Sequence, residues 1–235
     1  MIGEKIVSFE TINSTNRFLM ENHTNYPDGT VVVALKQTSG YGRNKRIWYS
    51  PKGGLWFSVL FKPRKQIEPS FYTRLFSVSV VRTLEKFKIH VNIKWPNDIY
   101  LYGRKLAGVL SEGIFEGKKP VAIVVGVGIN VNNDIPEELK TQAISLKEIM
   151  NKEFSLMKLL EMILKNARIL LRKYTKKKEA LTRIWKRYLI QKEGDILHLR
   201  EGGQEKLGRI VKITSDYLLI EIDGEIKKIY SIFPH

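Results

Sequence analysis

The stretch that decides the fold runs from Gln37 to Leu60 and reads QTSGYGRNKRIWYSPKGGLWFSVL. It opens with a glycine-spaced basic loop, GYGRNKR at 40–46, and closes with an apolar run, LWFSVL at 55–60. Glycines let a backbone approach a ligand closely, and three cations within four residues offer an anionic ligand positive charge. The loop is not a usual nucleotide-binding fingerprint, because Lys45 replaces the third glycine of G-x-G-x-x-G and no G-K-[ST] follows. The alternative interpretation is a solvated basic hairpin loop.

The segments on either side of this loop are typical of strands. TVVVAL at 30–35 is β-branched and predicts a buried strand, and residues 55–61 predict a second strand after the turn at 50–54. We therefore expect the loop to be held between two strands of one sheet. Because the loop is charged and poor in apolar anchors, we also predict that it is mobile without a ligand and becomes ordered over one.

The rest of the first 190 residues predicts an α+β fold, with a mixed, mostly antiparallel sheet and helices packed on it. Further strands are expected at 6–9, 91–95, 99–101, 106–110 and 120–131. The run at 120–131 is almost wholly apolar and predicts a central strand. Apolar residues at helical spacing predict helices at 15–21, 70–87, 155–171 and 179–189.

The pattern changes after residue 190. Four or five short strands separated by glycine turns are expected, at 194–200, 206–213, 217–222 and 225–232. We therefore predict a main domain at 1–190 and a small C-terminal β-barrel domain at 191–235. Because a unit of about forty residues is marginal alone, we expect it to pack on the main domain.

The composition limits the class of protein. The chain has 235 residues and no cysteine, which leaves no disulfide framework, thiolate zinc site or cysteine nucleophile. Its first residues lack the apolar segment of a secretory signal, and no run of about 18 apolar residues predicts a transmembrane helix. We therefore expect a cytoplasmic protein that is not attached to a membrane.

The formal net charge of +16 suits an anionic substrate, an acidic partner or nucleic acid. Between Lys152 and Lys192 the basic residues far outnumber the acidic ones. We favour a solvated, lysine-rich surface as the explanation of most of these charges. Aromatic residues are not interleaved with them as they would be in a groove that stacks single-stranded bases.

Four motifs occur in order along the chain: STN at 14–16, GYGRNKRIW at 40–48, KWPND with GRKLAG at 94–108, and GVGINVN at 126–132. Together they resemble the biotin protein ligase (biotin–[acetyl-CoA-carboxylase] ligase) family, in a short form without an N-terminal DNA-binding domain. The resemblance extends over residues 5–150 and, more loosely, the C-terminal tail. Any one of the motifs alone is a weak signal, and their order makes the set specific.

The resemblance implies the class II synthetase-like fold of a biotin ligase catalytic domain, here 1–190, and a two-step reaction. Biotin and ATP, with Mg²⁺, give biotinyl-5′-AMP and pyrophosphate. A specific lysine of a biotin carboxyl carrier protein then attacks the adenylate. Such chemistry needs a carboxylate held in line with the α-phosphorus and neutralisation of the phosphate charge, and it needs no side-chain nucleophile.

The resemblance implies three catalytic residues, Lys105, Arg43 and Asp98. Lys105 would bridge the biotin carboxylate and the α-phosphate, because an ammonium group is a compact point charge. Arg43 and Arg46 would bind phosphate oxygens through their guanidinium groups. Asp98 would position Mg²⁺ or the attacking lysine. Without the resemblance, an exposed turn lysine and a turn-capping aspartate explain the same residues.

The resemblance also implies two ligand subsites. Hydroxyl and amide groups suit the cyclic urea of biotin, and the implied biotin subsite comprises Ser14, Thr15, Asn16, Gln37, Gly40, Tyr41, Gly42, Arg43, Lys105 and Gly108. The implied ATP or adenylate subsite comprises Arg43, Arg46, Trp48, Asn97 and Asn130. Trp48 would close over biotin or stack on adenine. Apart from the position that Asp98 would give Mg²⁺, no protein side chain is assigned to a metal ion.

Other classes of protein fit parts of the pattern. A lipoate ligase or octanoyltransferase shares the fold group, but the Gly-Gly-Gly segment of lipoate ligases is missing and the cysteine-dependent octanoyltransferase is excluded by the lack of cysteine. A basic nucleic-acid-binding module without catalysis fits the charge but has no need of KWPND or KLAG. A biotin-responsive repressor requires an N-terminal helix-turn-helix domain, for which the motif at Ser14 leaves no room, so we expect no DNA partner. Exposed sheet edges make a homodimer a further prediction.

Overall fold

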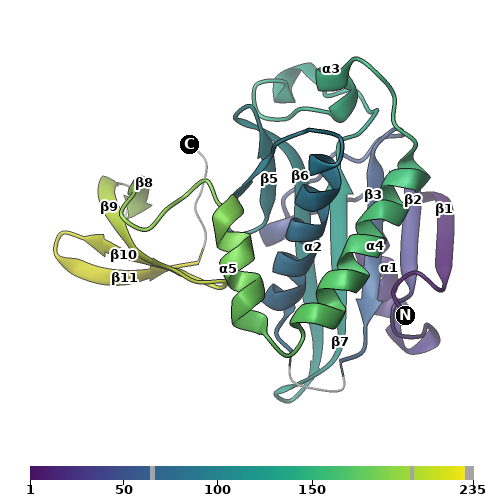
Figure 1. The fold of residues 1–235 in the computed structure, drawn as a ribbon, viewed down its shortest axis with the longest axis horizontal. Helices are drawn as coiled ribbons and strands as arrows, with labels where there is room; N and C mark the ends of the chain where they lie inside the picture. Colours follow the sequence, from purple (N-terminus) through teal and green to yellow (C-terminus); the bar gives the residue numbers. More distant parts are fainter. Residues whose placement is uncertain (64–66, 202–203, 231–235) are drawn as a thin grey trace.

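A computed structural model of the chain describes residues 1–63, 67–201 and 204–230. These residues form two sheets, one of seven strands and one of four, with helices against the larger sheet (Figure 1). The predicted α+β class is confirmed. Within the described part of the chain, no helix has the length and apolarity needed to cross a membrane.

The larger sheet has the order β1-β2-β3-β7-β6-β5-β4. Its strands are β1 (Ile6–Ile12), β2 (Val31–Gln37), β3 (Leu55–Phe61), β4 (Asn92–Lys94), β5 (Asp98–Leu101), β6 (Arg104–Glu116) and β7 (Lys119–Ile129). Only β1 and β2 are parallel, and every other pairing recorded in this sheet is antiparallel. The sheet is therefore mixed and mostly antiparallel, as predicted, and β7 lies at its centre.

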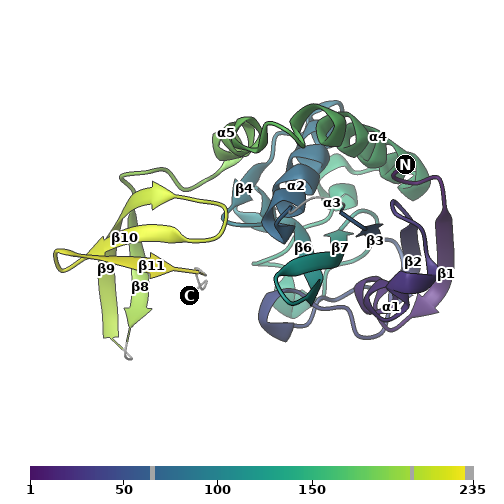
Figure 2. The ribbon, with the colours of Figure 1, turned by 90° about the horizontal axis from the view of Figure 1, so that it is seen from below.

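Three long helices cover one face of this sheet, α2 (Pro69–Glu85), α4 (Leu156–Tyr174) and α5 (Lys178–Tyr188) (Figures 1 and 2). Helix α2 lies on the strands, and α4 and α5 pack against α2. Almost every α2 side chain from Phe71 to Leu84 is buried, and together with the inward-facing residues of the sheet these side chains form one large apolar core. Burial of this apolar surface is the main contribution to the stability of the fold.

The opposite face carries the short helix α1 (Thr15–Asn22) and a much smaller apolar cluster (Figure 2). Alternation along β7 separates the two faces. Ile123, Val125 and Val127 belong to the large core, whereas Ala122 and Val124 belong to the cluster under α1. The short helix α3 (Leu146–Met150) and the 3-10 turns η1 (His23–Asn25), η2 (Arg43–Lys45) and η3 (Glu137–Leu139) complete the main unit.

The C-terminal strands are β8 (Ile196–Glu201), β9 (Gln204–Ile213), β10 (Leu218–Ile222) and β11 (Glu225–Ile229). They form an antiparallel sheet in the order β11-β10-β9-β8. We predicted a small barrel, but no β8–β11 pairing closes the sheet among the described residues. The end of the strand predicted at 225–232 and residues 231–235 of the predicted domain lie outside them.

Hydrogen bonds to the β4 region hold the C-terminal unit to the main unit. The backbone N–H of Trp95 donates to Gln191 Oε1 at 2.9 Å, and the Trp95 indole donates to the Thr214 carbonyl at 2.9 Å. The expected packing of the small unit on the large one is confirmed. The predicted boundary between residues 190 and 191 falls between α5 and β8, and independent folding of the two units stays a prediction.

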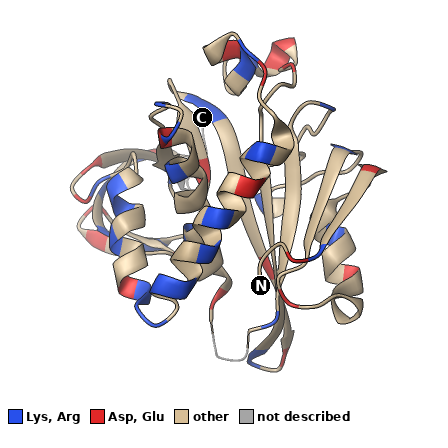
Figure 3. Cartoon of the chain, turned by 45° about the vertical axis from the view of Figure 1, so that its right-hand side comes forward, with Lys and Arg blue, Asp and Glu red and all other residues tan. Residues whose placement is uncertain are grey.

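Basic residues are frequent along α4 and α5 (Figure 3). On α4, the exposed residues Lys158, Lys165 and Arg172 are spaced seven positions apart. On α5, the exposed residues Arg183 and Arg187 are spaced four positions apart. The same helices bury Leu, Ile and Trp side chains on their inner sides. This arrangement agrees with the predicted solvated surface.

Candidate active site

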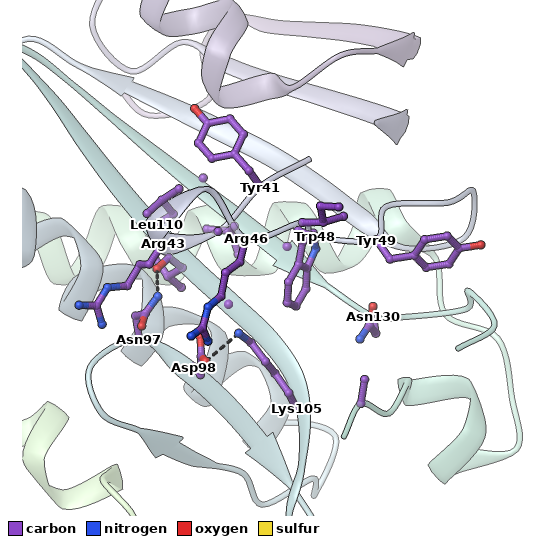
Figure 4. A pocket seen from close by; sticks show the side chains of 18 of the residues that line it. Tyr41, Arg43, Arg46, Trp48, Tyr49, Asn97, Asp98, Lys105, Leu110 and Asn130 are labelled. Atoms are coloured by element: carbon purple, nitrogen blue, oxygen red, sulfur yellow. Dashed lines mark hydrogen bonds and ion pairs between the residues drawn. The ribbon is translucent and has the colours of Figure 1, made fainter. Parts of the chain in front are cut away.

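A cavity of about 700 Å³ lies on the α1 side of the sheet, roofed by the basic loop (Figure 4). Its wall is formed by the N-terminal turn of α1, the loop after β2, the β5–β6 hairpin and the end of β7. Fourteen of the fifteen predicted site residues line it: Ser14, Thr15, Asn16, Gln37, Tyr41, Gly42, Arg43, Arg46, Trp48, Asn97, Asp98, Lys105, Gly108 and Asn130. Gly40 lies behind the wall, where a Cβ would come within 2.5 Å of the Ser50 hydroxyl.

The basic loop is itself a folded hairpin. The N–H of Gly42 donates to the Arg46 carbonyl at 2.8 Å, and the N–H of Trp48 donates to the Gly40 carbonyl at 2.9 Å. At its tip, Asn44 and Lys45 have φ values of 55° and 58°, in the left-handed region that most side chains avoid. Such a closed hairpin presents its side chains from one hydrogen-bonded turn, and its mobility without a ligand stays a prediction.

A chain of polar side chains forms one end of the cavity. Gln37 Oε1 accepts from the Thr15 N–H at 2.9 Å and from its hydroxyl at 3.1 Å, and Gln37 Nε2 donates to the Ser50 hydroxyl at 3.0 Å. The buried Ser58 hydroxyl on β3 lies 2.7 Å from Thr15 Oγ1 and 2.6 Å from Asn16 Oδ1. Buried polar groups need such partners, so this end of the cavity is pre-organised for a polar ligand.

Glu112 on β6 extends the network, and our sequence analysis missed it. Its Oε2 accepts from Asn16 Nδ2 and from the Tyr41 hydroxyl, both at 2.8 Å. Burial and the neighbouring Glu112 carboxylate raise the pKa of Tyr41, which therefore remains a protonated donor. Glu112 lies 96 positions from Asn16 in the chain, and only the β6–β7 pairing and the position of α1 bring them together.

Two glycines of β7 form the floor of the cavity, and sequence analysis assigned them no role. A Cβ on Gly126 would lie 2.3 Å from Asn16 Oδ1, and one on Gly128 would lie 2.5 Å from Trp48 Nε1. Real Cβ atoms do not approach so closely, so these positions need glycine for the two side chains to lie flat on the strand. The alternation of Gly126 and Gly128 with Val127 and Ile129 is the sequence signal that reveals this face.

Lys105 and Asp98 form an ion pair at the centre of the cavity, with Nζ and Oδ2 2.7 Å apart (Figure 4). The β5–β6 hairpin holds both residues, since Tyr102 and Gly103 at its turn have φ values of 50° and 74°. Lys105 Nζ lies 5.0 Å from the centroid of the Trp48 ring. The ammonium group of Lys105 is thus held in one position beside the Trp48 ring, where it can contact a bound anion.

The two loop arginines point in different directions (Figure 4). Arg46 reaches toward Asp98 and Lys105, whereas Arg43 turns away and donates from Nη2 to the Tyr230 carbonyl at 2.6 Å. Partial burial lowers the pKa of Arg43 from its ordinary high value. Arg43 therefore joins the loop to the C-terminal unit, a contact that sequence analysis did not predict.

The two predicted asparagines are buried at the edge of the cavity and already hydrogen-bonded. Asn97 Nδ2 donates to the Val109 carbonyl at 2.7 Å, and Asn130 Oδ1 accepts from Asn133 Nδ2 at 3.2 Å. Asn97 therefore has a structural role, besides the ligand contact predicted for it. Trp48 differs, because its buried Nε1 has no hydrogen-bond partner among the described residues.

No group of three or more His, Cys, Asp or Glu side chains that would hold a metal ion occurs within the described ranges. Asp98 is the carboxylate among the residues lining the cavity. A cation brought in by a phosphate ligand would meet this one acidic side chain. Such a donor set suits Mg²⁺, which usually keeps several waters and binds through one or two carboxylates plus substrate phosphates.

A family model described as the biotin/lipoate A/B protein ligase family matches residues 8–130. The chain belongs to this family. Among curated members, the bifunctional ligase/repressor BirA of Bacillus subtilis (strain 168) is 33% identical over 240 residues, which cover 98% of this chain and 74% of that protein. Biotin–protein ligase 1 of Arabidopsis thaliana is 32% identical over 141 residues, which cover 57% of this chain and 38% of that protein.

Solved structures of the family have the same fold. The biotin protein ligase from Aquifex aeolicus in complex with biotin and ATP superposes with a TM-score of 0.81 at 32% identity, covering 97% of this chain and 96% of that one. The biotin protein ligase from Leishmania major in complex with biotinyl-5-AMP superposes with a TM-score of 0.69 at 21% identity, covering 97% and 99%. At that lower identity the likeness concerns the fold alone.

Proposed function

We propose that this chain is an ATP-dependent biotin–protein ligase. It activates biotin as biotinyl-5′-AMP and transfers the biotinyl group to a specific lysine of a biotin carboxyl carrier protein. The Lys105–Asp98 pair carries the proposal, because it lies between the polar end of one cavity and its arginine-bearing roof. Membership in the family and the fold shared with the Aquifex aeolicus enzyme support the same activity.

The polar end of the cavity suits the ureido ring of biotin. A cyclic urea has two N–H donors and one carbonyl acceptor. The hydroxyl of Thr15 and the amides of Asn16 and Gln37 line this end of the cavity. The buried Ser58 hydroxyl holds Thr15 and Asn16 from behind, and Gln37 accepts from Thr15. Gly126 and Gly128 leave a flat slot beside Trp48 for the apolar part of the ligand. Biotin would then extend toward Lys105 with its carboxylate foremost.

In the first step, a biotin carboxylate oxygen attacks the α-phosphorus of ATP. A new O–P bond forms, and the bond from the α-phosphorus to the bridging oxygen breaks, with its electron pair leaving on pyrophosphate. Lys105 neutralises both the attacking carboxylate and the α-phosphate, and Arg46 adds a second cation from the loop. Mg²⁺ bound with ATP adds positive charge at the phosphates, and Asp98 is the side chain that would hold it.

In the second step, the neutral amine of the acceptor lysine attacks the acyl carbon, and AMP leaves with the electron pair of the C–O bond. Lys105 stabilises the AMP phosphate as charge returns to it. Asp98 offers an oxygen to the incoming amine, whose nitrogen releases one proton to water as the amide forms. Biotin and ATP are the proposed small-molecule substrates. A homodimer through the edge strands β1 or β4 and a cytoplasmic location stay predictions.

Biotin-dependent exchange of labelled pyrophosphate into ATP tests this proposal, with lipoate as a parallel substrate and Mg²⁺ present. We expect exchange when biotin is the substrate and no exchange when lipoate replaces it. Exchange with lipoate instead would assign the chain to the lipoate branch of the family. Exchange with neither, together with a salt-dependent gel shift, would favour the nucleic-acid-binding alternative.

A further inference from the structure

A buried arginine lies outside the site described so far. Arg74 on α2 is only 3% exposed. Its Nε and Nη1 atoms are buried and have no hydrogen-bond partner among the described residues. Its nearest ion-pair partner is Glu68, whose Oε1 lies 3.7 Å from Nη2, while Glu68 Oε2 binds Lys178 Nζ at 3.0 Å. A buried cation with unused donors is costly unless a ligand completes it.

Arg74 lines a second cavity of about 200 Å³. The hydroxyl-bearing residues Ser70, Thr73, Ser111 and Ser215 also line this cavity. The Ser70 hydroxyl is buried and has no hydrogen-bond partner among the described residues. The volume exceeds the roughly 30 Å³ that one molecule occupies in liquid water. The wall is thus rich in donors and large enough for an anion of several atoms.

The second cavity adjoins the first. Five residues line both of them: Arg43, Pro96, Asn97, Val109 and Leu110. Arg43 is the loop arginine that turns away from Lys105 (Figure 4), and its guanidinium has further donors besides the one bound to Tyr230. A ligand that begins at Lys105 and passes Arg43 therefore reaches Arg74.

The charges of this wall favour an anion. It carries two guanidinium groups, Arg43 and Arg74, against one carboxylate, Asp216, whose Oδ2 already accepts from the Ser215 hydroxyl at 2.6 Å. Burial lowers the pKa of both arginines even though carboxylates lie near each of them, and a bound anion would favour their charged forms. The ammonium of an acceptor lysine would be repelled here.

We propose that this cavity receives the pyrophosphate end of ATP, with Arg74 and Arg43 donating to the β- and γ-phosphate oxygens. The inference rests on the function proposed above and adds a phosphate subsite between α2 and the Ser215–Asp216 turn. Arg74 then binds the leaving group, since the bridging oxygen takes the electron pair when the bond to the α-phosphorus breaks. The C-terminal unit closes this subsite through Ser215 and Asp216.

The test uses the full chain with Arg74→Met and Arg74→Lys, and with Glu68→Gln as the matched control. Glu68→Gln removes the ion pair of Arg74 without touching the wall of the cavity. Inorganic pyrophosphate with Mg²⁺ is titrated by calorimetry and as a product inhibitor of adenylate formation. Chemically prepared biotinyl-5′-AMP then measures transfer to the carrier protein without the first step.

We expect Arg74→Met to weaken pyrophosphate affinity and raise the KM for ATP by about 10- to 100-fold, the effect of removing a charged hydrogen-bonding group. Transfer from biotinyl-5′-AMP should stay within about twofold, and Arg74→Lys should recover part of the affinity. Glu68→Gln should bind pyrophosphate like the wild-type chain.

Unchanged pyrophosphate affinity in a folded Arg74→Met chain would overturn the inference. So would an equal loss of transfer from biotinyl-5′-AMP, because that result indicates general damage or a subsite for the acceptor. If the wild-type chain shows no biotin-dependent exchange, the proposed function fails. The calorimetric titration then decides separately whether the cavity binds pyrophosphate.

Discussion

The two faces of the seven-stranded sheet are formed by the same strands, but they differ in the side chains that they present around the cavity. On the helix face, β3 and β7 present Phe57, Val59, Val125 and Val127 to a large apolar core. On the opposite face, the ligand face, the same strands present Ser58, Gly126 and Gly128 near the cavity, and Leu60 and Val124 in the small cluster under α1. Packing on the helix face fixes the positions of the strands, and the ligand face presents its site residues from those strands.

This difference explains how one face of the sheet can carry an open cavity without loss of the fold. A close-packed core resists movement of the backbone, so the ligand face need not be filled to stay in place. The missing side chains at Gly126 and Gly128 create the slot, while Asn16 and Trp48 are held above it. We therefore expect substitutions on the two faces to separate stability from activity.

The largest effect is expected at Lys105 on the ligand face. Lys105→Ala should slow adenylate formation by about 10³-fold, because it removes a fixed cation from a site of developing charge. Pyrophosphate exchange measures that rate, and the melting temperature should not fall. Arg104→Ala is the matched control, since Arg104 precedes Lys105 on the hairpin and pairs with Glu148 instead. Near-normal exchange by Lys105→Ala would remove this residue from the mechanism.

The helix face should show the reverse behaviour. Ile123→Ala removes a fully buried side chain from the large core and should lower the free energy of unfolding by roughly 2–5 kcal/mol. Urea denaturation measures this loss. At a temperature where the variant is folded, its KM for biotin should match that of the wild-type chain, and a clear rise would mean that the two faces are coupled.

Gly126→Ala tests the floor of the ligand face. The added methyl group would lie 2.3 Å from Asn16 Oδ1, so Asn16 must move and its hydrogen bonds weaken. We expect the KM for biotin to rise by about 10- to 100-fold, as for a buried polar group that loses its partner. Stability should fall modestly, because the displaced Asn16 side chain loses part of its buried hydrogen bonding. Unaltered biotin binding would show that this floor is not the biotin slot.

The smallest effect is expected at Glu112. Glu112→Gln keeps the shape but gives Asn16 and Tyr41 a weaker, neutral acceptor for their two hydrogen bonds. We expect biotin affinity to fall by about 10-fold, since hydrogen bonds to charged groups exceed neutral ones by about 1 kcal/mol. Calorimetry with biotin provides the measurement. Glu116→Gln, farther along β6, is the control and should bind biotin normally.

The fold could be predicted from local apolar patterns, and most of the wall of the site from the family resemblance that the four ordered motifs carry. Apolar spacing predicted the helices, and ordered motifs predicted Lys105, Asp98 and the loop arginines. The missed residues depend on register between distant segments. Glu112 and Asn16 are 96 positions apart in the sequence. In the sequence, Arg74 is not distinguishable from any other polar residue of a mostly apolar helix, and only its neighbours in the structure show its role.

The C-terminal unit shows the same limit. Its short strands were visible as runs between glycine turns, but whether they close a barrel depends on pairing that no local pattern reveals. The contact from Arg43 to Tyr230 joins residues 187 positions apart. No spacing rule connects the two, and only the packed C-terminal unit places that carbonyl beside the loop.

The long sequence separations in the ligand-face network also affect how quickly and in what order the molecule folds. The β5–β6–β7 meander pairs neighbours in the chain and needs only short loops to close, whereas the Asn16–Glu112 and Arg43–Tyr230 bonds require most of the chain to be in place. We therefore expect the meander to be structured in the folding transition state and the network to form after it. Ligands that bind this network should then slow unfolding while leaving the folding rate unchanged. Biotin would protect the native chain kinetically without acting as a template for folding.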